Sequence, residues 1–127
     1  MLVWDKISGP GSSYAFIHEL ILFAEKGTPC MKGSNIFRFP GFSGGAKKTN
    51  GEMVHPTQKP VEVIEKLITD STKEGDLVLD CFMGSGTTAV AAKKLNRNFI
   101  GYEIQEKYIE IAKRRLMQVD LELTFKA

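Results

Sequence analysis

Two carboxylates and a pair of glycines are the residues whose types and spacing could bind and orient a ligand. Asp80 and Glu103 each follow a short apolar run, and the segment G-S-G-T-T-A lies between them at residues 84–89. This segment matches the G-x-G-x-x-G/A pattern, in which glycines let the backbone of a strand-to-helix turn approach a ligand closely. The glycines do not specify the ligand, so the flanking residues must.

The carboxylates favour one nucleoside ligand over another. A nicotinamide dinucleotide would place its pyrophosphate at the helix N-terminus after the loop, where a carboxylate at position 80 is repulsive. The ammonium group of S-adenosylmethionine would instead be attracted to Asp80. Glu103 could accept hydrogen bonds from both ribose hydroxyls of an adenosine. The residues therefore favour S-adenosylmethionine, and a nicotinamide oxidoreductase is the alternative.

The elements that must position these residues follow one another regularly from Pro56 onward. Apolar periodicity predicts helices over 60–71, 87–95 and 105–118, and apolar runs predict strands over 76–81 and 98–103. The inward-facing residues are expected to be Val61, Ile64, Leu67 and Ile68 in the first helix and Tyr108, Ile109, Ala112 and Leu116 in the last, with Lys113, Arg114 and Arg115 in its final turns. Alternating helices and strands are typical of a parallel, doubly wound α/β sheet, whose ligands bind at the carboxyl ends of the strands.

The first half of the chain is less regular. Residues 1–4 and 19–27 are predicted to be strands, the second ending at Gly27, with a turn over 8–13. Residues 40–51 hold four glycines and no periodicity, which predicts a loop, and 35–39 could form a strand.

Composition limits the class of protein. The 127 residues, 43% apolar and 25% charged, are typical of one globular domain. No apolar run approaches the roughly 20 residues of a membrane span, and the N-terminus lacks signal-peptide features. Cys30 and Cys81 offer neither a disulfide framework nor metal-ligand spacing. We therefore expect a cytoplasmic protein without membrane contact.

Two stretches of the sequence resemble a known family. "HPTQKPVEVIEKLI" and "GDLVLDCFMGSGTTAVAAKKLNRNFIGYEIQEKYIEIAKRRL", within residues 55–116, resemble the C-terminal part of the DNA amino-methyltransferases. These enzymes methylate adenine at N6 or cytosine at N4. "LVWDK" and "HELILFAEKG" are similar to strands that, in the permuted group, lie between the catalytic motif and a target-recognition region.

The resemblance implies a Rossmann-like methyltransferase sheet and a set of residues that bind S-adenosylmethionine. Glu103 would hold the ribose. The residues that would flank or cradle the cofactor are Thr57, Lys59, Pro60, Asp80, Phe82, Gly84, Ser85, Gly86 and Thr87. Simpler roles remain open for some of them: a solvated lysine at Lys59, a core ring at Phe82, and helix capping by Ser85 or Thr87.

The family's catalytic motif, (Asn/Asp/Ser)-Pro-Pro-(Tyr/Phe), is not found. It orients the target amine and stacks on the flipped base, but this sequence has no Pro-Pro dipeptide. We therefore expect an incomplete sheet that lacks the strand carrying this motif, and we assign no catalytic or metal-binding residue. Cys30 follows a proline, as in cytosine-C5 methyltransferases, but no activating base is recognisable nearby. Cys81 is expected to be a small core residue.

The expected organisation is a single partial methyltransferase domain over 1–127, with strands in 1–26, a basic glycine-rich loop in 27–54 and the cofactor-binding part in 55–127. Residues 26–54 carry five basic side chains against Glu52, a net charge of +4. Such an excess suits DNA phosphates, with Arg38, Lys47 and Lys48 as candidate contacts, or a solvated loop. The expected partners are DNA and either a second chain with the catalytic half or a second copy. The alternative is a non-catalytic remnant or a subunit of a split enzyme.

Overall fold

The computed structural model describes residues 1–6, 18–27, 34–39, 48–49, 52–53 and 58–124. Its elements, in chain order, are β1 (Leu2–Asp5), β2 (His18–Ile21), β3 (Ile36–Arg38), β4 (Lys48–Thr49), β5 (Glu52–Met53), α1 (Val61–Ser71), β6 (Leu77–Asp80), α2 (Thr87–Lys94), β7 (Asn98–Gly101) and α3 (Glu106–Thr124). The helices and strands predicted after Pro56 are thus confirmed, although the strand predicted over 98–103 ends at Gly101. The loop predicted over 40–51 is wrong at Lys48–Thr49, which pair with β5 as a strand. The turn predicted over 8–13 lies outside the described residues.

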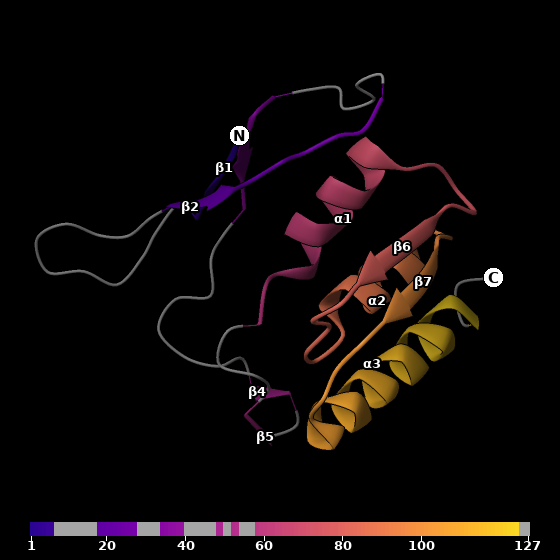
Figure 1. Cartoon of the computed structure of the whole chain (residues 1–127). Coiled ribbons are helices and arrows are strands. Elements are labelled where there is room, and N and C mark those ends of the chain that lie inside the picture. Colours follow the sequence, from indigo (N-terminus) through magenta and orange to yellow (C-terminus); the bar gives the residue numbers. More distant parts are fainter. Residues whose placement is uncertain (7–17, 28–33, 40–47, 50–51, 54–57, 125–127) are drawn as a thin grey trace, which may run out of the picture.

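The second half of the chain is built around a βαβ unit (Figure 1). β6 and β7 pair in parallel, with Leu77 opposite Asn98 and Asp80 opposite Gly101. α2 joins the two strands and packs against both α1 and α3. It can approach its neighbours closely because its buried face consists of small side chains, including Ala91 and Ala92. The carboxyl ends of β6 and β7 therefore lie side by side, as the sequence predicts.

The first half forms a separate three-stranded sheet in the order β2-β1-β3, antiparallel between β1 and β2 and parallel between β1 and β3. The prediction that β2 runs to Gly27 is wrong, because the strand ends at Ile21. The register explains this end: Ile21 pairs with Leu2, the first residue of β1, so the next residues have no partner strand on that side. Leu22 is accordingly exposed.

α1 lies between the two sheets (Figure 1) and packs in both directions. Ile68 is buried against Ala91 and Ala92 of α2, on the predicted apolar face. Val63, outside that predicted face, is also buried, and the Lys66 ammonium lies 5.6 Å from the centre of the Phe37 ring in β3. A second partner for α1 explains why its buried surface is wider than one apolar stripe.

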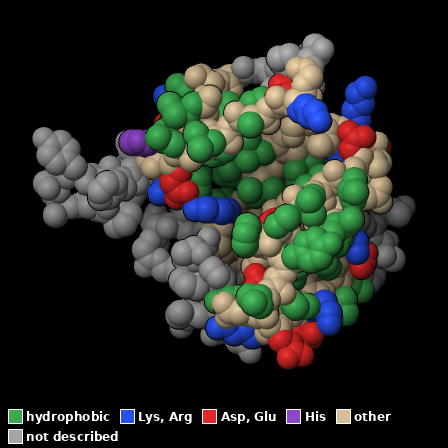
Figure 2. All heavy atoms as spheres, in the orientation of Figure 1, with side chains coloured by type: hydrophobic (Ala, Val, Ile, Leu, Met, Phe, Trp, Pro, Cys, Tyr) green, Lys and Arg blue, Asp and Glu red, His purple; other side chains and the backbone are tan. Residues whose placement is uncertain are grey.

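The β6–β7 sheet is covered on one side only. Its inner side chains pack against α2, but Leu77 and Leu79 are each 59% exposed and Ile100 is 43% exposed on the outer face. Figure 2 shows hydrophobic side chains gathered over α1, β6 and β7. Within the described part of the chain, β6 pairs with β7 alone. Parallel sheets are normally buried on both faces, so this α/β sheet is incomplete, as expected.

α3 is longer than predicted and ends at Thr124 rather than near residue 118. Lys113, Arg114 and Arg115 therefore occupy the middle of the helix, and the prediction that they lie in its last turns is wrong. No helix among the described residues is both long and apolar enough to cross a membrane.

Candidate functional site

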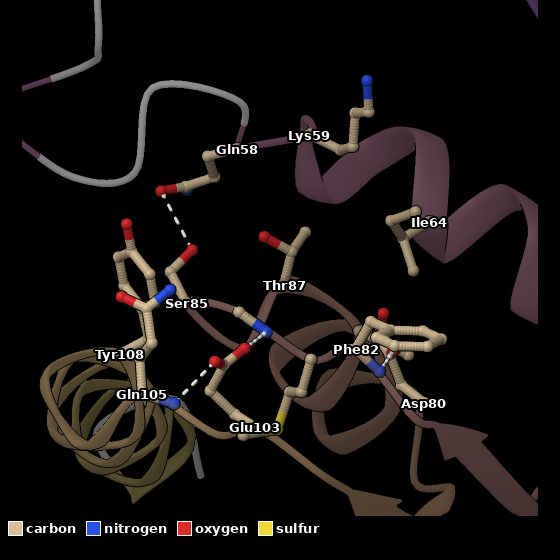
Figure 3. Close-up of a pocket in the computed structure, with 13 residues that line it drawn as sticks. Gln58, Lys59, Ile64, Asp80, Phe82, Ser85, Thr87, Glu103, Gln105 and Tyr108 are labelled. Atoms are coloured by element: carbon tan, nitrogen blue, oxygen red, sulfur yellow. Dashed lines mark hydrogen bonds between the residues drawn. The ribbon is translucent and has the colours of Figure 1, made fainter.

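A cavity of about 320 Å³ opens at the carboxyl ends of β6 and β7 (Figure 3). Its size falls within the range of small-molecule sites, which starts at about 300 Å³. The lining residues are Gln58, Lys59, Ile64, Asp80, Phe82, Met83, Gly84, Ser85, Thr87, Thr88, Glu103, Gln105 and Tyr108. Seven of the ten residues predicted to bind a cofactor are in this set, so the structure brings most of that prediction into one place.

Asp80 is the last residue of β6, and its carboxylate borders the cavity. Its Oδ1 accepts a hydrogen bond from the backbone N–H of Phe82 at 3.0 Å. An ionised carboxylate has about four acceptor sites, so this bond leaves capacity for a ligand. Phe82 is 91% exposed, which excludes the core role left open by the sequence. Cys81 is also exposed, so its predicted place in the core is wrong.

Glu103 lies two residues beyond β7 and is held by backbone donors. Oε2 accepts the N–H of Gly84 at 2.9 Å, and Oε1 accepts the N–H of Gln105 at 2.8 Å (Figure 3). The N–H of Met83 donates to the carbonyl of Tyr102 at 2.9 Å, a second link between the two strand ends. The carboxylate is thus oriented by the protein before any ligand arrives, with acceptor sites to spare.

The glycine loop has backbone angles that other residues rarely adopt. Gly84 and Gly86 have φ of +54° and +81°, and the N–H of Gly86 donates to the carbonyl of Met83 at 3.0 Å. Gly86 is the N-cap of α2, and no side chain caps this helix. The capping role left open for Ser85 and Thr87 is therefore wrong: both side chains are buried and accept hydrogen bonds from Arg115.

Lys59 borders the cavity, but its ammonium is engaged elsewhere. Nζ donates to Oε2 of Glu19 in β2 at 2.6 Å and lies 5.8 Å from the centre of the Trp4 ring. In Figure 3 the ammonium points away from Glu103. Lys59 is exposed, with 47% of its side-chain surface accessible, so the solvated role left open by the sequence stands, with the addition of this ion pair. Pro60 is buried as the N-cap of α1, and Thr57 lies outside the described residues.

Glu19 is the centre of a small charge cluster that ties the first sheet to the cavity. Lys6 approaches its Oε1 at 3.0 Å, and Lys59 approaches Oε2. Burial raises the pKa of Glu19, but the hydrogen bonds and charges of Lys59 and Lys6 outweigh it, so the pKa is lowered overall. The cluster fixes the segment that leads into α1 against β2.

The candidate DNA contacts are only partly described. Arg38 ends β3, with its side chain 76% exposed and its Nε 3.2 Å from Oδ2 of Asp5. Lys47 and the side chain of Lys48 lie outside the described residues. No group of three or more potential metal ligands occurs in the part of the chain that the structure describes.

Comparison with known proteins identifies the family. The family model described as DNA methylase matches residues 25–114, which includes both strand ends, the glycine loop and the cavity. The chain belongs to the DNA methylase family.

Individual DNA methylases are similar over shorter stretches. The type II methyltransferase M2.DpnII of Streptococcus pneumoniae is 56% identical over 62 residues, covering 49% of this chain and 23% of that protein. M1.MboII of Moraxella bovis is 50% identical over 78 residues, covering 59% of this chain and 30% of that protein. The crystal structure of the M1.HpyAVI–SAM complex is 32% identical with a TM-score of 0.65, covering 91% of this chain and 60% of that one.

These matches establish an S-adenosylmethionine-dependent DNA methyltransferase fold for this DNA methylase domain. The matched stretches span less than a third of the curated relatives.

Several cavity residues were not predicted. Gln105 is the residue just before α3, and Tyr108 lies in the first turn of that helix, with its N–H bonded to the Gln105 carbonyl at 2.9 Å. Gln58 lies inside the segment quoted from the sequence, and the Ser85 hydroxyl donates to its Oε1 at 3.5 Å. The sequence could have indicated these residues, because Gln105 and Tyr108 follow Glu103 closely and Gln58 is the polar residue next to Lys59.

Proposed function

We propose that this chain is the S-adenosylmethionine-binding portion of a DNA methyltransferase that methylates the exocyclic amine of adenine (N6) or cytosine (N4). The observation that carries the proposal is the placement of Asp80, the glycine loop and Glu103 around one cavity at adjacent strand ends. Family membership and the relative solved with SAM support it.

The residues fit the groups of the cofactor. The Asp80 carboxylate suits the ammonium of its methionine part, and Glu103 suits the ribose hydroxyls. The exposed Phe82 ring offers an apolar wall for the adenine. When bound, the cofactor supplies a sulfonium methyl group for transfer to an amine nitrogen. Of the flanking residues, Lys59 would act through the position of its backbone, since its ammonium is bound to Glu19.

DNA is the proposed substrate. We therefore also propose that the protein is cytoplasmic. The net charge of +4 over residues 26–54 favours phosphate contact by the basic segment at 27–54, which includes β3, β4 and β5, with Arg38, Lys47 and Lys48 as candidates. A titration with duplex DNA at low salt tests this: binding should weaken as salt rises. No binding at low salt would refute the assignment.

A second candidate function is a subunit of a split enzyme, or a cofactor-binding remnant. The exposed leucines of the β6–β7 outer face and the single pairing of β6 among described strands favour it. The sequence also has no Pro-Pro dipeptide. We propose that a second polypeptide carrying the catalytic motif covers this face, with a second copy of this chain as the competing outcome.

Calorimetry with S-adenosylmethionine, S-adenosylhomocysteine and NAD tests the proposed ligand. We expect binding of the first two and none of NAD. Asp80→Asn should lower S-adenosylmethionine affinity by about tenfold, because the ammonium loses an ionic partner. Tighter binding of NAD than of either adenosyl ligand would overturn the proposal.

Asp76→Asn is a matched control for this measurement. Asp76 precedes β6 as Asp80 ends it, and its carboxylate likewise accepts a backbone N–H, from Lys73 at 2.8 Å. The control should bind the cofactor like the unaltered chain. Equal losses in the two variants would mean that the effect comes from the strand and not from the ligand.

A further inference from the structure

Arg115 reaches from the middle of α3 into the glycine loop. Its Nη1 donates to the backbone carbonyl of Ser85 at 2.6 Å and approaches both the Ser85 hydroxyl and the Thr87 hydroxyl at 3.2 Å. All three acceptors belong to the last turn before α2 or to its first residue. The guanidinium is not among the groups that line the cavity.

The neighbouring turn of α3 touches the same loop. Ala112 lies three residues before Arg115, on the same helical face. A Cβ added to Gly86 would lie 2.7 Å from the Cβ of Ala112, so helix and loop are in direct contact. α3 thus contacts the loop at Ser85, Gly86 and Thr87, and Glu103 binds the N–H of Gly84.

Two effects make the position of the Arg115 guanidinium energetically unfavourable. Burial lowers the pKa of the Arg115 guanidinium. The N-terminus of α2 also carries the positive end of the helix dipole, which repels a nearby cation. The hydrogen bonds to Ser85 and Thr87 must offset both effects, and a shorter apolar side chain would avoid them.

We propose that Arg115 is a positioning residue that holds the glycine loop in the conformation required for cofactor binding without touching the cofactor. The part of this inference that concerns affinity for the cofactor rests on the proposed function. The effect of Arg115 on the loop is independent of that function. Removal of the guanidinium should take this donor away from the Ser85 carbonyl and from both hydroxyls, and the loop should then open more often.

The test compares Arg115→Gln with Arg97→Gln. Arg97 is the matched control because it also makes hydrogen bonds to backbone carbonyls and a hydroxyl, those of Leu95 and Thr72, away from the cavity. Two quantities are measured at a temperature where each variant is folded: hydrogen exchange of the Gly86 amide, which is bonded to Met83, and the dissociation constant for S-adenosylhomocysteine.

We expect Arg115→Gln to speed exchange at Gly86 and to weaken binding on the order of tenfold. Arg97→Gln should change neither, even if both variants melt at similarly lower temperatures. Equal behaviour of the two variants in exchange and affinity would overturn the proposal, because Arg115 would then serve stability alone.

Two further arms keep the test decisive. If the unaltered chain binds no adenosyl ligand, the proposed function fails, and the Gly86 exchange rate alone decides whether Arg115 positions the loop. If Arg115→Gln does not fold, Arg115→Lys replaces it. Lysine can donate from a single nitrogen, as Nη1 does, but is shorter, so exchange at Gly86 should be faster and binding weaker than in the unaltered chain. Values like those of the unaltered chain would refute the proposal.

Discussion

The Glu103 carboxylate accepts a hydrogen bond from the Gly84 backbone N–H at 2.9 Å, across 19 positions of the chain. The acid that follows β7 therefore shapes the loop that follows β6. A ligand held by Glu103 would meet a loop already placed by the same side chain, so binding need not pay to order the two strand ends.

The first prediction concerns this double role. Glu103→Gln keeps one acceptor oxygen but loses the charge and the second acceptor, so affinity for S-adenosylhomocysteine should fall by about tenfold in calorimetry. Glu103→Ala should bind more weakly still. Glu106→Gln, an exposed change in the first turn of α3, is the control. An unchanged dissociation constant in Glu103→Gln would mean that this residue serves the loop alone.

The second prediction separates backbone strain from steric contact at the loop. Gly86 and Gly75 have nearly equal φ of +81° and +82°, but a Cβ meets Ala112 at 2.7 Å in the first and nothing within 4 Å in the second. Gly75→Ala should cost about 1 kcal/mol of unfolding free energy, and Gly86→Ala about 1–3 kcal/mol more. Chemical denaturation measures both, and equal losses would contradict the close contact.

The third prediction concerns acid stability. Because the pKa of Glu19 is lowered in the folded chain, its stabilising contribution is complete above the ordinary value of 4.5 and is lost as pH falls through the folded pKa. Stability measured from pH 6 down to pH 3 should therefore fall less steeply in Glu19→Gln than in the unaltered chain. Glu74→Gln, an exposed change in the turn before β6, should follow the unaltered profile. Parallel profiles for the Glu19 variant would refute the prediction.

The fourth prediction is association through the outer face of β6 and β7. Sedimentation at micromolar concentration should show a dimer or a complex with a second polypeptide, since exposed leucines and an open strand edge favour association. Leu79→Lys should shift the species toward monomer, and Leu22→Lys, an equally polar change at an exposed residue after β2, should not. A stable monomer of the unaltered chain would show that this face needs no partner.

The fifth prediction is catalytic. With no Pro-Pro-aromatic motif to orient the amine, this chain alone should transfer no measurable methyl from labelled S-adenosylmethionine to DNA. Adding a polypeptide that carries the motif should restore transfer. Robust methylation by the chain alone, abolished by Asp80→Ala, would refute the partial-enzyme proposal and direct attention to Asn35, Asn50 and His55.

Local patterns predicted the second half of the fold better than the first. The order β6–α2–β7 follows from apolar runs and glycines, and it alone places Asp80 near Glu103. The end of β2 was not predictable in this way, because the register with β1 sets it. The burial of Val63 was not predictable either, because it lies outside the apolar stripe of α1.

The partners of the charged side chains at the site were also not predictable from local sequence patterns. Lys59 binds Glu19 over 40 positions, and Arg115 binds Ser85 over 30. When the acceptor of a lysine or arginine is distant in the chain, the sequence alone does not indicate that the two residues are paired. The types of residue at the site were therefore predictable, but their partners depended on tertiary packing.

The contact between Gly86 and Ala112 also fixes how long the connection between β7 and α3 can be. Each residue of a helix turns the chain by about 100°, so the phase of α3 depends on the residue at which it begins. One residue inserted after Glu103 would bring Ile111 to the loop, and one deleted would bring Lys113, and either change would also turn Arg115 away from Ser85. Sequences that keep this site should vary in the length of other connections but not of this one.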